Sequence, residues 1–528
     1  MKRITYPSAD IPRTSRVIAL GFFDGIHLGH RAVLREALEQ ADMAGCAAAA
    51  FTFDDLPKAH KAGRLLSDAD TDALLTRMEL DELFVGQFTA LRDLSPEDFV
   101  RRVLREQLGA QAVVCGFNYH FGQNGAGDAA RLCVLGAQCG MRVTVLPPVL
   151  ADGEPISSTR IRAAVAAGDL LLANRLLGHP LTIHAPVIDG HHLGRTLGTP
   201  TINQPLADGL TLPAFGVYAS AVEVAGHVTY GVTNIGVKPT VGSECPLAET
   251  WIPEFEGDLY GKAVPVTPTV FLRPERKFPS VEALRERITA DGERTRRLFV
   301  GEEPDAPRAV LFDFDDTLQN CALAFLNFFR AFVRRRFPDL PPAEQETRAL
   351  QMAHSNQNGY VPYATYVEQM QAQYDWAAVL NRDEIVQAIW HEFPRFTTLL
   401  PGVAEGLRAL RAQGWRLGIV TNGYSQIQNR KLDICGLRPL FDGIVISGDE
   451  DVHKPDPEIF RRAAARIGVA PARCIFVGDH PVNDIEGAGA AGMRPVFMQA
   501  SGRFAPPDGV PVIRSMDELL ARLPEFTA

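Results

Sequence analysis

The segment GFFDGIHLGH, Gly21 to His30, follows the apolar run RVIAL at Arg16 to Leu20. A helical pattern comes next and places five apolar residues on one face: Val33, Leu34, Ala37, Leu38 and Ala41. A glycine-rich turn between a strand and a helix favours phosphate, because the unpaired N–H groups and the dipole of the helix start attract an anion. His27 and His30 lie three residues apart at this helix start and can face one bound polyphosphate. The two histidines are also compatible with a purely structural role.

Short apolar runs and helical patterns alternate from residue 16 to residue 150, where AAAAFTF, QAVVCGF and RVTVLPPV are further predicted strands. Such alternation implies a parallel sheet with helices on both faces. From about Thr182 the chain becomes rich in strand-forming residues, glycine and proline, which predicts a small antiparallel barrel. A helix from Ser280 to about Gly292 is expected to close this part.

After Arg308 the alternation of strands and helices returns, with a mostly helical insertion between Leu318 and about Phe396. The acidic, proline-containing segment GEEPDAP before it predicts a linker. We therefore predict a multidomain fold with four parts: an α/β Rossmann-like domain at 1–180, an antiparallel β-barrel at 181–300, a linker at 301–307, and an α/β domain at 308–528 with a helical cap at about 319–396.

The 528 residues include 53 basic and 63 acidic side chains, which gives a formal net charge of −10. This charge argues against a nucleic-acid-binding protein, which needs a concentrated basic face. The eight cysteines include no Cys-x-x-Cys pair, as expected for free thiols in a reducing compartment. Neither a signal peptide nor an apolar run of about 18 residues is evident, so we expect a cytoplasmic enzyme without a membrane segment. The oligomeric state stays open, and a homo-oligomer is compatible with the sequence.

Two further segments accompany GFFDGIHLGH: GFNYHFG at Gly116 to Gly122 and ISSTRIR at Ile156 to Arg162. Together the three resemble the FAD synthetase part of the bifunctional bacterial riboflavin kinase/FAD synthetase family. The resemblance implies adenylylation of FMN to FAD with ATP, in which His27 and His30 stabilise the developing charge. It also implies a set of ATP- and flavin-binding residues: Gly21, Asp24, Gly25, Gly29, Asn118, Ser158, Thr159 and Arg162.

The chain departs from this family at one place. Many members carry a Pro-His-Pro tripeptide after the second strand, where this chain has Asp55-Leu56-Pro57. The departure leaves open that the N-terminal half acts as a kinase only.

The segment GHHLGRTLGTPTIN, Gly190 to Asn203, contains glycines at 190, 194 and 198 that let the backbone approach phosphate. The Thr201 hydroxyl and the Asn203 carbonyl oxygen are hard ligands suited to Mg²⁺. A simple turn would account for Pro-Thr-x-Asn alone, but the whole segment resembles the riboflavin kinase part of the same family. The resemblance implies transfer of phosphate from ATP to riboflavin, with Glu249 as the base. It further implies four residues that bind ATP or flavin: Gly190, Gly194, Arg195 and Gly198.

The segment DFDDTL begins at Asp313 and ends an apolar run, which places Asp313 and Asp315 at the carboxyl end of a strand. TNG, HKPDP and GDHPVND follow it in that order. An Asp-x-Asp pair alone is often a solvated turn, but the four segments together resemble the haloacid-dehalogenase-like hydrolase superfamily. The resemblance implies a phosphatase that depends on Mg²⁺.

This second resemblance assigns Asp313 as the nucleophile and Asp315 as the general acid and base. Thr421 and Asn422 would hold the phosphoryl group, and Lys454 would neutralise its charge. The implied magnesium ligands are four carboxylates: Asp313, Asp315, Asp479 and Asp484.

The helical insertion is expected to act as a cap that supplies substrate specificity. Its phenylalanine stripe predicts a packed helix rather than a membrane-surface helix: Phe325, Phe328, Phe329 and Phe332. Six further aromatic residues either stack on a planar substrate ring or pack between helices: Tyr360, Tyr363, Tyr366, Tyr374, Trp376 and Trp390.

The substrate of the expected phosphatase is an open question at this stage. Hydrolysis of FMN would undo the kinase reaction, which favours a phosphorylated pyrimidine precursor of riboflavin or a related small phosphate. A nucleotide or a sugar phosphate fits the same segments, and so does a catalytically inactive domain that senses flavin.

Overall fold

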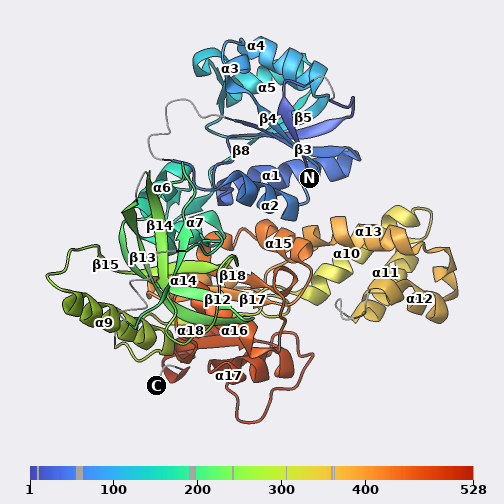
Figure 1. The fold of residues 1–528 in the computed structure, drawn as a ribbon. Helices are drawn as coiled ribbons and strands as arrows, with labels where there is room; N and C mark the ends of the chain where they lie inside the picture. Colours follow the sequence, from blue (N-terminus) through green and yellow to red (C-terminus); the bar gives the residue numbers. More distant parts are fainter. Residues whose placement is uncertain are drawn as a thin grey trace. The chain divides into compact units, whose positions relative to one another are not determined.

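A computed structural model describes residues 1–8, 11–54, 63–189, 198–240, 243–304, 306–357, 361 and 363–526. The side chains at 238–240, 243–245 and 363–364 lie outside this description. The chain divides into two units, Met1–Arg297 and Leu298–Ala528, and Figure 1 labels many of their elements.

A six-stranded sheet forms the first part of unit 1. Its strands are β1 (Lys2–Tyr6), β2 (Arg16–Leu20), β3 (Ala47–Phe53), β4 (Glu82–Gly86), β5 (Ala110–Gly116) and β8 (Arg142–Leu146). They lie in the order β1-β4-β3-β2-β5-β8, and all neighbouring strands run parallel. Because the chain moves outward from β2 in both directions, the carboxyl end of β2 is the switch point of a doubly wound sheet.

Helices cover both faces of this sheet, as predicted (Figure 1). α1 (Leu28–Ala44) and α2 (Asp68–Arg77) pack on one face through buried side chains such as Leu34 and Leu75. The other face is covered by α3 (Phe88–Leu91), α4 (Pro96–Asp98), the π-helical η2 (Phe99–Gln107) and α5 (Ala129–Gln138). Short elements complete this part: β6 (His120–Phe121), η3 (Gln123–Gly125), β7 (Gly127–Asp128), β9 (Leu150–Ala151) and β10 (Glu154–Pro155).

An antiparallel barrel forms the second part of unit 1. Its strands are β11 (Thr201–Pro205), β12 (Gly216–Val224), β13 (His227–Thr240), β14 (Ser243–Trp251) and β15 (Val266–Pro274), in the order β11-β14-β13-β12-β15. The segment 183–188 closes the barrel, because Ile183 pairs with Val266 on one edge strand and Ile188 pairs with Asn203 on the other. α6 (Ser158–Ala166) and α7 (Leu170–Leu177) share one apolar core with the barrel. The boundary predicted at residue 180, between the Rossmann-like domain and the barrel, therefore stays a prediction.

The helix after the barrel is longer than the sequence pattern predicted. α9 spans Val281–Val300 and continues past Gly292, where we had expected it to end. A Cβ at Gly292 would lie 2.4 Å from Cζ3 of Trp251, so the glycine lets the helix pack closely on β14. The neighbouring Asp291 is 1% exposed and pairs with Arg273 at 2.7 Å. Gly292 is thus a packing residue inside the helix and not its end.

Unit 2 contains a second parallel sheet. Its strands are β16 (Ala309–Phe312), β17 (Arg416–Thr421), β18 (Gly443–Ile446), β19 (Cys474–Gly478), β20 (Arg494–Met498) and β21 (Val512–Ile513). The order is β18-β17-β16-β19-β20-β21, so β16 holds the same switch position that β2 holds in unit 1. The helical segments around this sheet are α14 (Val403–Ala412), α15 (Ser425–Ile434), η7 (Arg438–Leu440), η8 (Ser447–Asp449), α16 (Pro457–Arg466), η9 (Pro471–Arg473), η10 (Pro481–Glu486), α17 (Gly487–Ala490), α18 (Met516–Arg522) and η11 (Leu523–Phe526).

The insertion between β16 and β17 forms a helical lobe beside this sheet, in agreement with the predicted cap (Figure 1). Its elements are α10 (Cys321–Arg336), α11 (Pro342–Asn356), α12 (Tyr363–Gln373), η5 (Asp375–Val379), α13 (Arg382–His391) and η6 (Phe393–Phe396). The four phenylalanines of the predicted stripe are all buried in the core of this lobe. Tyr366 is fully buried and donates its hydroxyl to the Met352 carbonyl at 2.7 Å, whereas Tyr360 lies outside the described residues.

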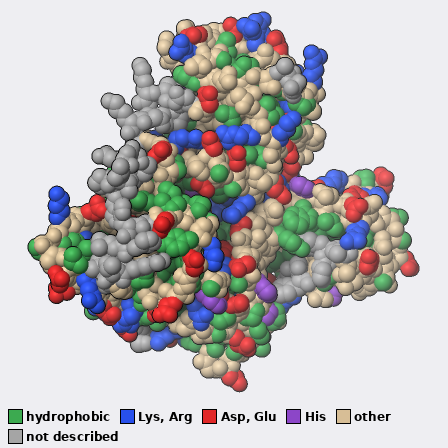
Figure 2. Space-filling view, in the orientation of Figure 1, with side chains coloured by type: hydrophobic (Ala, Val, Ile, Leu, Met, Phe, Trp, Pro, Cys, Tyr) green, Lys and Arg blue, Asp and Glu red, His purple; other side chains and the backbone are tan. Residues whose placement is uncertain are grey.

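Among the helices of the described part, none is long and apolar enough to cross a membrane. Figure 2 shows basic and acidic side chains mixed over the visible face, as the near balance of 53 basic and 63 acidic residues leads one to expect.

Two glycines of α17 should respond oppositely to alanine. A Cβ at Gly487 would lie 2.7 Å from Cε2 of Phe460 and 2.8 Å from the carbonyl oxygen of Pro455, whereas Gly489 has open space around it. We expect Gly487→Ala to lower the free energy of unfolding by about 1–3 kcal/mol. Gly489→Ala should raise it by about 0.5–1 kcal/mol, because glycine costs more backbone entropy. Thermal unfolding followed by circular dichroism measures both changes, and equal effects of the two substitutions would contradict the packing described here.

Candidate functional sites

The turn between β2 and α1 holds three residues with positive φ: Phe23 at 51°, Gly25 at 85° and Ile26 at 42°. Non-glycine residues in this region cost about 1–3 kcal/mol each and persist only where the surrounding structure holds them. Phe23 and Ile26 are held here by burial of their side chains. A Cβ on Gly25 would lie 2.8 Å from Cδ1 of Leu65, so this position requires glycine. The turn is thus a tightly fixed backbone at the switch point of the sheet.

His27 and His30 lie together at the start of α1. The Nδ1 of His27 accepts the backbone N–H of His30 at 3.1 Å, and the two rings stack with their centroids 3.6 Å apart. Burial lowers the pKa of both side chains, to about 4 for His27. The buried Nδ1 of His30 has no hydrogen-bond partner within the described part of the chain. Both rings are therefore neutral near pH 7, and the histidines cannot supply positive charge there.

Asp24 joins the turn to the start of α6. Its Oδ2 accepts a hydrogen bond from Arg162 at 2.5 Å, and its Oδ1 accepts the N–H of Leu65 at 2.8 Å. The Ser158 hydroxyl donates to the Asp24 carbonyl at 3.1 Å. Asp24 thus meets Ser158 and Arg162, which lie 134 and 138 residues later in the sequence, beside the two histidines. Arg162 supplies a cation to a site whose histidines are neutral.

The other residues predicted for this site lie around it. Asn118 is exposed just after β5, the strand that pairs with β2, and Thr159 is exposed in the first turn of α6. A Cβ on Gly21 would lie 3.1 Å from the Phe23 ring, and one on Gly29 would lie 3.1 Å from Cε1 of His27. The departure at 55–57 lies outside the described residues.

Sequence reasoning missed His179 at this site. Its Nε2 lies 3.0 Å from the carbonyl oxygen of Gly25, to which it donates, and burial lowers its pKa. His179 follows α7 in a Gly-His-Pro turn, and no pattern in that segment pointed to the site. The side chain of His179 thus stabilises the turn through this hydrogen bond, although the residue does not belong to the predicted phosphate-binding segments.

In the barrel, three polar residues form one row across three strands. Asn203 of β11 is the register partner of Glu249 of β14, which is also the register partner of Asn234 of β13. All three side chains are half-buried, and Thr201 lies on the same face because alternate residues of a strand share a face. The opposite face carries buried residues such as Ala248 and Ile235. The structure therefore brings together the predicted base and the two predicted magnesium ligands.

Asn234 was not among the predicted site residues, although it lies in the TNIG segment of β13. Its Nδ2 donates to Glu275 at 3.0 Å, which fixes its amide beside Glu249. Gly198 has a φ of 74°, with open space where a Cβ would lie. The predicted binding residues Gly190, Gly194 and Arg195 lie outside the described residues.

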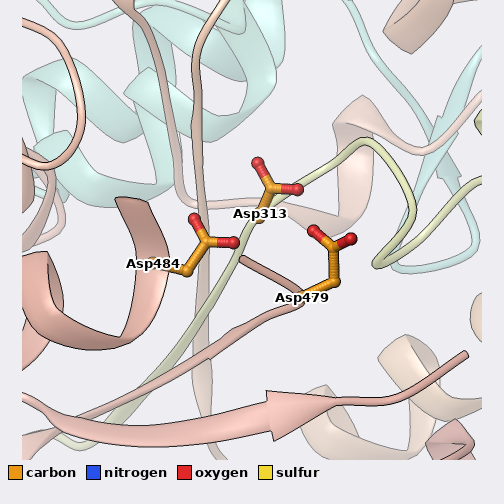
Figure 3. Close-up of side chains that lie close together, drawn as sticks. All are labelled: Asp313, Asp479 and Asp484. Atoms are coloured by element: carbon orange, nitrogen blue, oxygen red, sulfur yellow. The ribbon is translucent and has the colours of Figure 1, made fainter. Parts of the chain in front are cut away.

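In unit 2, three buried carboxylates converge at the carboxyl ends of β16 and β19. One oxygen from each of Asp313, Asp479 and Asp484 lies within 4.8 Å of the others. Figure 3 shows the three side chains next to one another, with their carboxylates on the same side. Oxygen ligands at this spacing suit a small divalent cation such as Mg²⁺. The predicted fourth ligand, Asp315, is not part of this group of three.

Lys454 lies against the three carboxylates. Its Nζ is 2.5 Å from Asp313 and 2.7 Å from Asp484, and its side chain is 4% exposed. The Asn422 side chain holds the lysine backbone, since its Nδ2 donates to the Lys454 carbonyl at 3.0 Å and its Oδ1 accepts the Lys454 N–H at 2.9 Å. Asn422, predicted to hold a phosphoryl group, therefore positions the lysine. Lys454 itself comes eight residues after the end of β18, at Ile446.

Asp315 is held by residues that sequence reasoning missed. Lys431 donates to its Oδ1 at 2.5 Å, Gln428 donates to its Oδ2 at 3.0 Å, and Gln319 also donates to it. Gln428 and Lys431 lie on one face of α15, and Gln428 also donates to the hydroxyl of Thr421 at 2.7 Å. A buried glutamine and lysine three residues apart on a helix resemble an ordinary surface pair in the sequence, so no signal singled them out.

Burial dominates the titration of the carboxylate group. It raises the pKa of Asp313 to about 7 in spite of the nearby Lys454, and it raises the pKa of Asp479 to about 9 with help from Asp313 and Asp484. Burial alone would lower the pKa of Lys454, but Asp313 and Asp484 outweigh it and raise that pKa. If all three carboxylates are ionised, they carry more negative charge than one lysine offsets, and a divalent cation would balance it.

A cavity of about 410 Å³ opens over these residues in unit 2. Its lining includes Asp313, Asp315, Lys431 and Lys454, together with side chains of the cap such as Phe393. All of the predicted residues of this third site line the cavity: Asp313, Asp315, Thr421, Asn422, Lys454, Asp479 and Asp484.

Family models match three successive parts of the chain. They describe FAD synthetase at residues 11–160, riboflavin kinase at residues 177–299 and haloacid dehalogenase-like hydrolase at residues 307–492. The order of the matches follows the order of the three sites described above.

Two curated relatives each match a little more than half of this chain. The bifunctional riboflavin kinase/FMN adenylyltransferase of Listeria monocytogenes is 36% identical over 293 residues, which cover 54% of this chain and 93% of that protein. The protein of the same name from Pseudomonas fluorescens is 37% identical over 288 residues, or 53% and 92% of the two chains. The crystal structure of a macrolide-efflux protein from Streptococcus pneumoniae is 32% identical, covers 56% of this chain and 99% of that one, and has a TM-score of 0.50.

The neutral state of His27 predicts how acid affects unit 1. The unfolded chain binds a proton at this histidine below about pH 6.5, whereas the folded protein binds it only near pH 4. Stability should therefore fall as the pH is lowered from 6.5 to 4, by at most about 1.4 kcal/mol per pH unit for one such group. His27→Asn keeps an acceptor for the first turn of α1 and should flatten this dependence. Thermal midpoints of both proteins across this range measure the effect, and parallel curves would exclude His27 as its source.

Proposed function

The chain belongs to the bifunctional riboflavin kinase/FMN adenylyltransferase family, and from this premise we propose that unit 1 converts riboflavin to FMN and FMN to FAD with ATP. Unit 2 adds a phosphatase that acts on a small phosphate ester. The observation that carries the second part is the contact of Lys454 with Asp313 and Asp484, in a group of carboxylates at the carboxyl end of a parallel sheet.

Adenylyl transfer is supported by the turn at Gly21 to His30. The FMN phosphate oxygen forms a bond to the α-phosphorus of ATP, and the bond to pyrophosphate breaks. In the proposed role, the backbone N–H groups at the start of α1 bind the phosphates, and His27 and His30 act as neutral hydrogen-bonding groups beside them. Arg162, fixed by Asp24, offers positive charge to the same phosphates.

Phosphorylation of riboflavin is supported by the polar row of the barrel. Glu249 would take the proton of the ribityl hydroxyl, whose oxygen then forms a bond to the γ-phosphorus of ATP as ADP leaves. Thr201 and Asn203 offer oxygen ligands on the same face of the sheet as this carboxylate. When held there, Mg²⁺ would offset negative charge on the transferred phosphate.

The phosphatase reaction follows from the unit 2 site. A carboxylate oxygen of Asp313 forms a bond to phosphorus, the bond to the leaving-group oxygen breaks, and Asp315 donates a proton to that oxygen. Water then attacks the phosphorus of the aspartyl phosphate, Asp315 takes its proton, and inorganic phosphate leaves. Lys431, Gln428 and Gln319 hold Asp315 in place for both steps. Mg²⁺ held by the three carboxylates would offset charge on the phosphate in both steps.

We favour a phosphorylated pyrimidine precursor of riboflavin as the substrate of this phosphatase. A chain that made FMN in unit 1 and hydrolysed it in unit 2 would consume ATP without gain. Removal of phosphate from a precursor instead supplies a compound from which riboflavin is made. The two units would then act in one pathway, with the phosphatase ahead of the kinase.

Glu249→Gln should separate the two activities of unit 1. The amide cannot take the ribityl proton, so we expect the rate of FMN formation to fall by roughly 10²- to 10⁴-fold. Adenylylation of added FMN should change little, because Glu249 belongs to the barrel. Chromatography of riboflavin, FMN and FAD after mixing with ATP and Mg²⁺ measures both rates, with the exposed Glu286→Gln on α9 as a control. Equal loss of both activities would contradict the assignment of Glu249.

Asp313→Asn should abolish phosphate release by unit 2. Loss of the nucleophile is expected to lower turnover of acetyl phosphate by roughly 10⁴-fold or more, whereas the exposed Asp508→Asn should retain it. If FMN is not a substrate, FMN and FAD will accumulate from riboflavin at the same rate in wild type and Asp313→Asn. Faster accumulation in the variant would show that unit 2 consumes the flavin product. Undiminished phosphate release would exclude Asp313 as the nucleophile.

A further inference from the structure

The described lining of the unit 2 cavity contains side chains of different chemistry. Its phosphate end is the part with the carboxylates, Lys454 and Lys431. Polar residues such as Gln428 and His480 also line the cavity. Six further residues of the cap and the start of α15 form what we call the apolar wall: Cys321, Phe325, Val361, Phe393, Tyr424 and Ile427. If the phosphate of a substrate lies against Asp313, this wall is a surface on which the leaving group can pack.

The aromatic rings of the apolar wall differ in their exposure to solvent. Phe325 and Phe393 stack on each other with centroids 3.9 Å apart and are 2% and 1% exposed, so each has one face already covered. Tyr424 is 57% exposed, and its ring centroid lies 4.8 Å from that of Trp390 at an angle of 51°. Tyr424 therefore presents an accessible aromatic surface beside a cavity whose volume is near the lower end of the roughly 300–1,000 Å³ of ligand pockets.

The charges that line the cavity limit what else a substrate can carry. Its described lining contains five aspartates, no arginine and two lysines. Both ammonium groups are already paired, Lys454 with Asp313 and Asp484, and Lys431 with Asp315. His480 adjoins Asp479 at the phosphate end. A second phosphate or a carboxylate on the leaving group would therefore meet a described lining with more aspartates than lysines, which disfavours a further negative charge.

The geometry points to a substrate class that deepens the function proposed for unit 2 and rests on it: a phosphate monoester whose leaving group ends in one planar ring and carries no second anionic group. The ring stacks on Tyr424, and the aspartates of the lining disfavour a further negative charge. A phosphorylated pyrimidine with a ribose-like chain belongs to this class. Sugar phosphates lack the ring, and phosphorylated carboxylic acids carry the excluded charge.

Two matched pairs of probes test this class with the full chain, Mg²⁺ and no ATP. Uridine 5′-monophosphate and ribose 5-phosphate differ by the ring, and glycerol 3-phosphate and 3-phosphoglycerate differ by the carboxylate. We expect kcat/KM for phosphate release to be at least about tenfold higher for the first member of each pair. A ratio near one for the first pair would overturn the role of the ring, and a ratio near one for the second would overturn the exclusion of charge.

A substitution at Tyr424 then tests the residue itself. Tyr424→Ala should reduce the ratio of uridine 5′-monophosphate to ribose 5-phosphate by about tenfold, because the stacking surface is lost. Tyr424→Phe keeps the ring and should keep the ratio. Val379→Ala is a matched control, because Val379 is also 57% exposed and is not among the residues that line the cavity. An unchanged ratio in Tyr424→Ala would overturn the proposal.

The proposed function and this substrate class fail in different ways. If the wild type releases phosphate from none of the four probes, or if Asp313→Asn releases it equally well, the phosphatase proposal fails and takes the substrate class with it. If release depends on Asp313 but does not discriminate within the two pairs, only the substrate class fails.

Discussion

Parallel strands bring their carboxyl ends to one edge of a sheet, and this chain depends on that constraint twice. β2 and β16 each lie where the strand order turns in both directions, so the segments that follow them border a crevice. The neighbouring strands deliver further groups to the same edge: Asn118 after β5 in unit 1, and Thr421 and Asp479 after β17 and β19 in unit 2. The order of the strands thus brings together residues that are distant in sequence. The barrel reaches the same result through register, with Asn203, Glu249 and Asn234 in one row.

Electrostatics then decides what each gathered site can hold. In unit 2, burial of several carboxylates is unfavourable unless cations approach them, and Lys454 and Lys431 are themselves almost fully buried. Lys454 contacts Asp313 and Asp484 but makes no salt bridge to Asp479 within the described part of the chain, and the pKa of Asp479 is raised furthest. The missing positive charge is therefore next to Asp479, where the three carboxylates converge. Unit 1 differs from unit 2 in its electrostatics. Its two buried histidines are neutral, and the positive charge beside them comes from Arg162, which Asp24 holds in place.

The sequence predicted both sheets, the barrel and the cap, because each rests on a periodic pattern that burial imposes locally. The predictions failed where the role of a residue depends on a tertiary contact. Gly292 looked like a helix end, but it packs on Trp251. Lys431 and Gln428 looked like an exposed pair, but α15 turns them toward Asp315. Whether aromatic residues of the cap stack on a substrate ring stays a prediction. Among the side chains that the structure describes, the exposed aromatic ring in the cavity lining is that of Tyr424, which lies outside the cap. Whether a residue makes such a tertiary contact depends on which elements pack against each other, and a local sequence pattern does not contain this information.

The position of the cap bears on why a kinase and a phosphatase can share one chain. In the function proposed for unit 2, Asp313 and Lys454 act on the phosphate group, which all monoesters have in common. Under this proposal, any discrimination between FMN and a smaller phosphate depends on the contacts of the leaving group. The cavity lining offers apolar side chains of the cap and α15 for such contacts, for example Phe325 and Ile427. Under the proposed function, selectivity thus depends on the part of the lining that carries Tyr424, because the chemistry proposed at Asp313 is the same for every monoester.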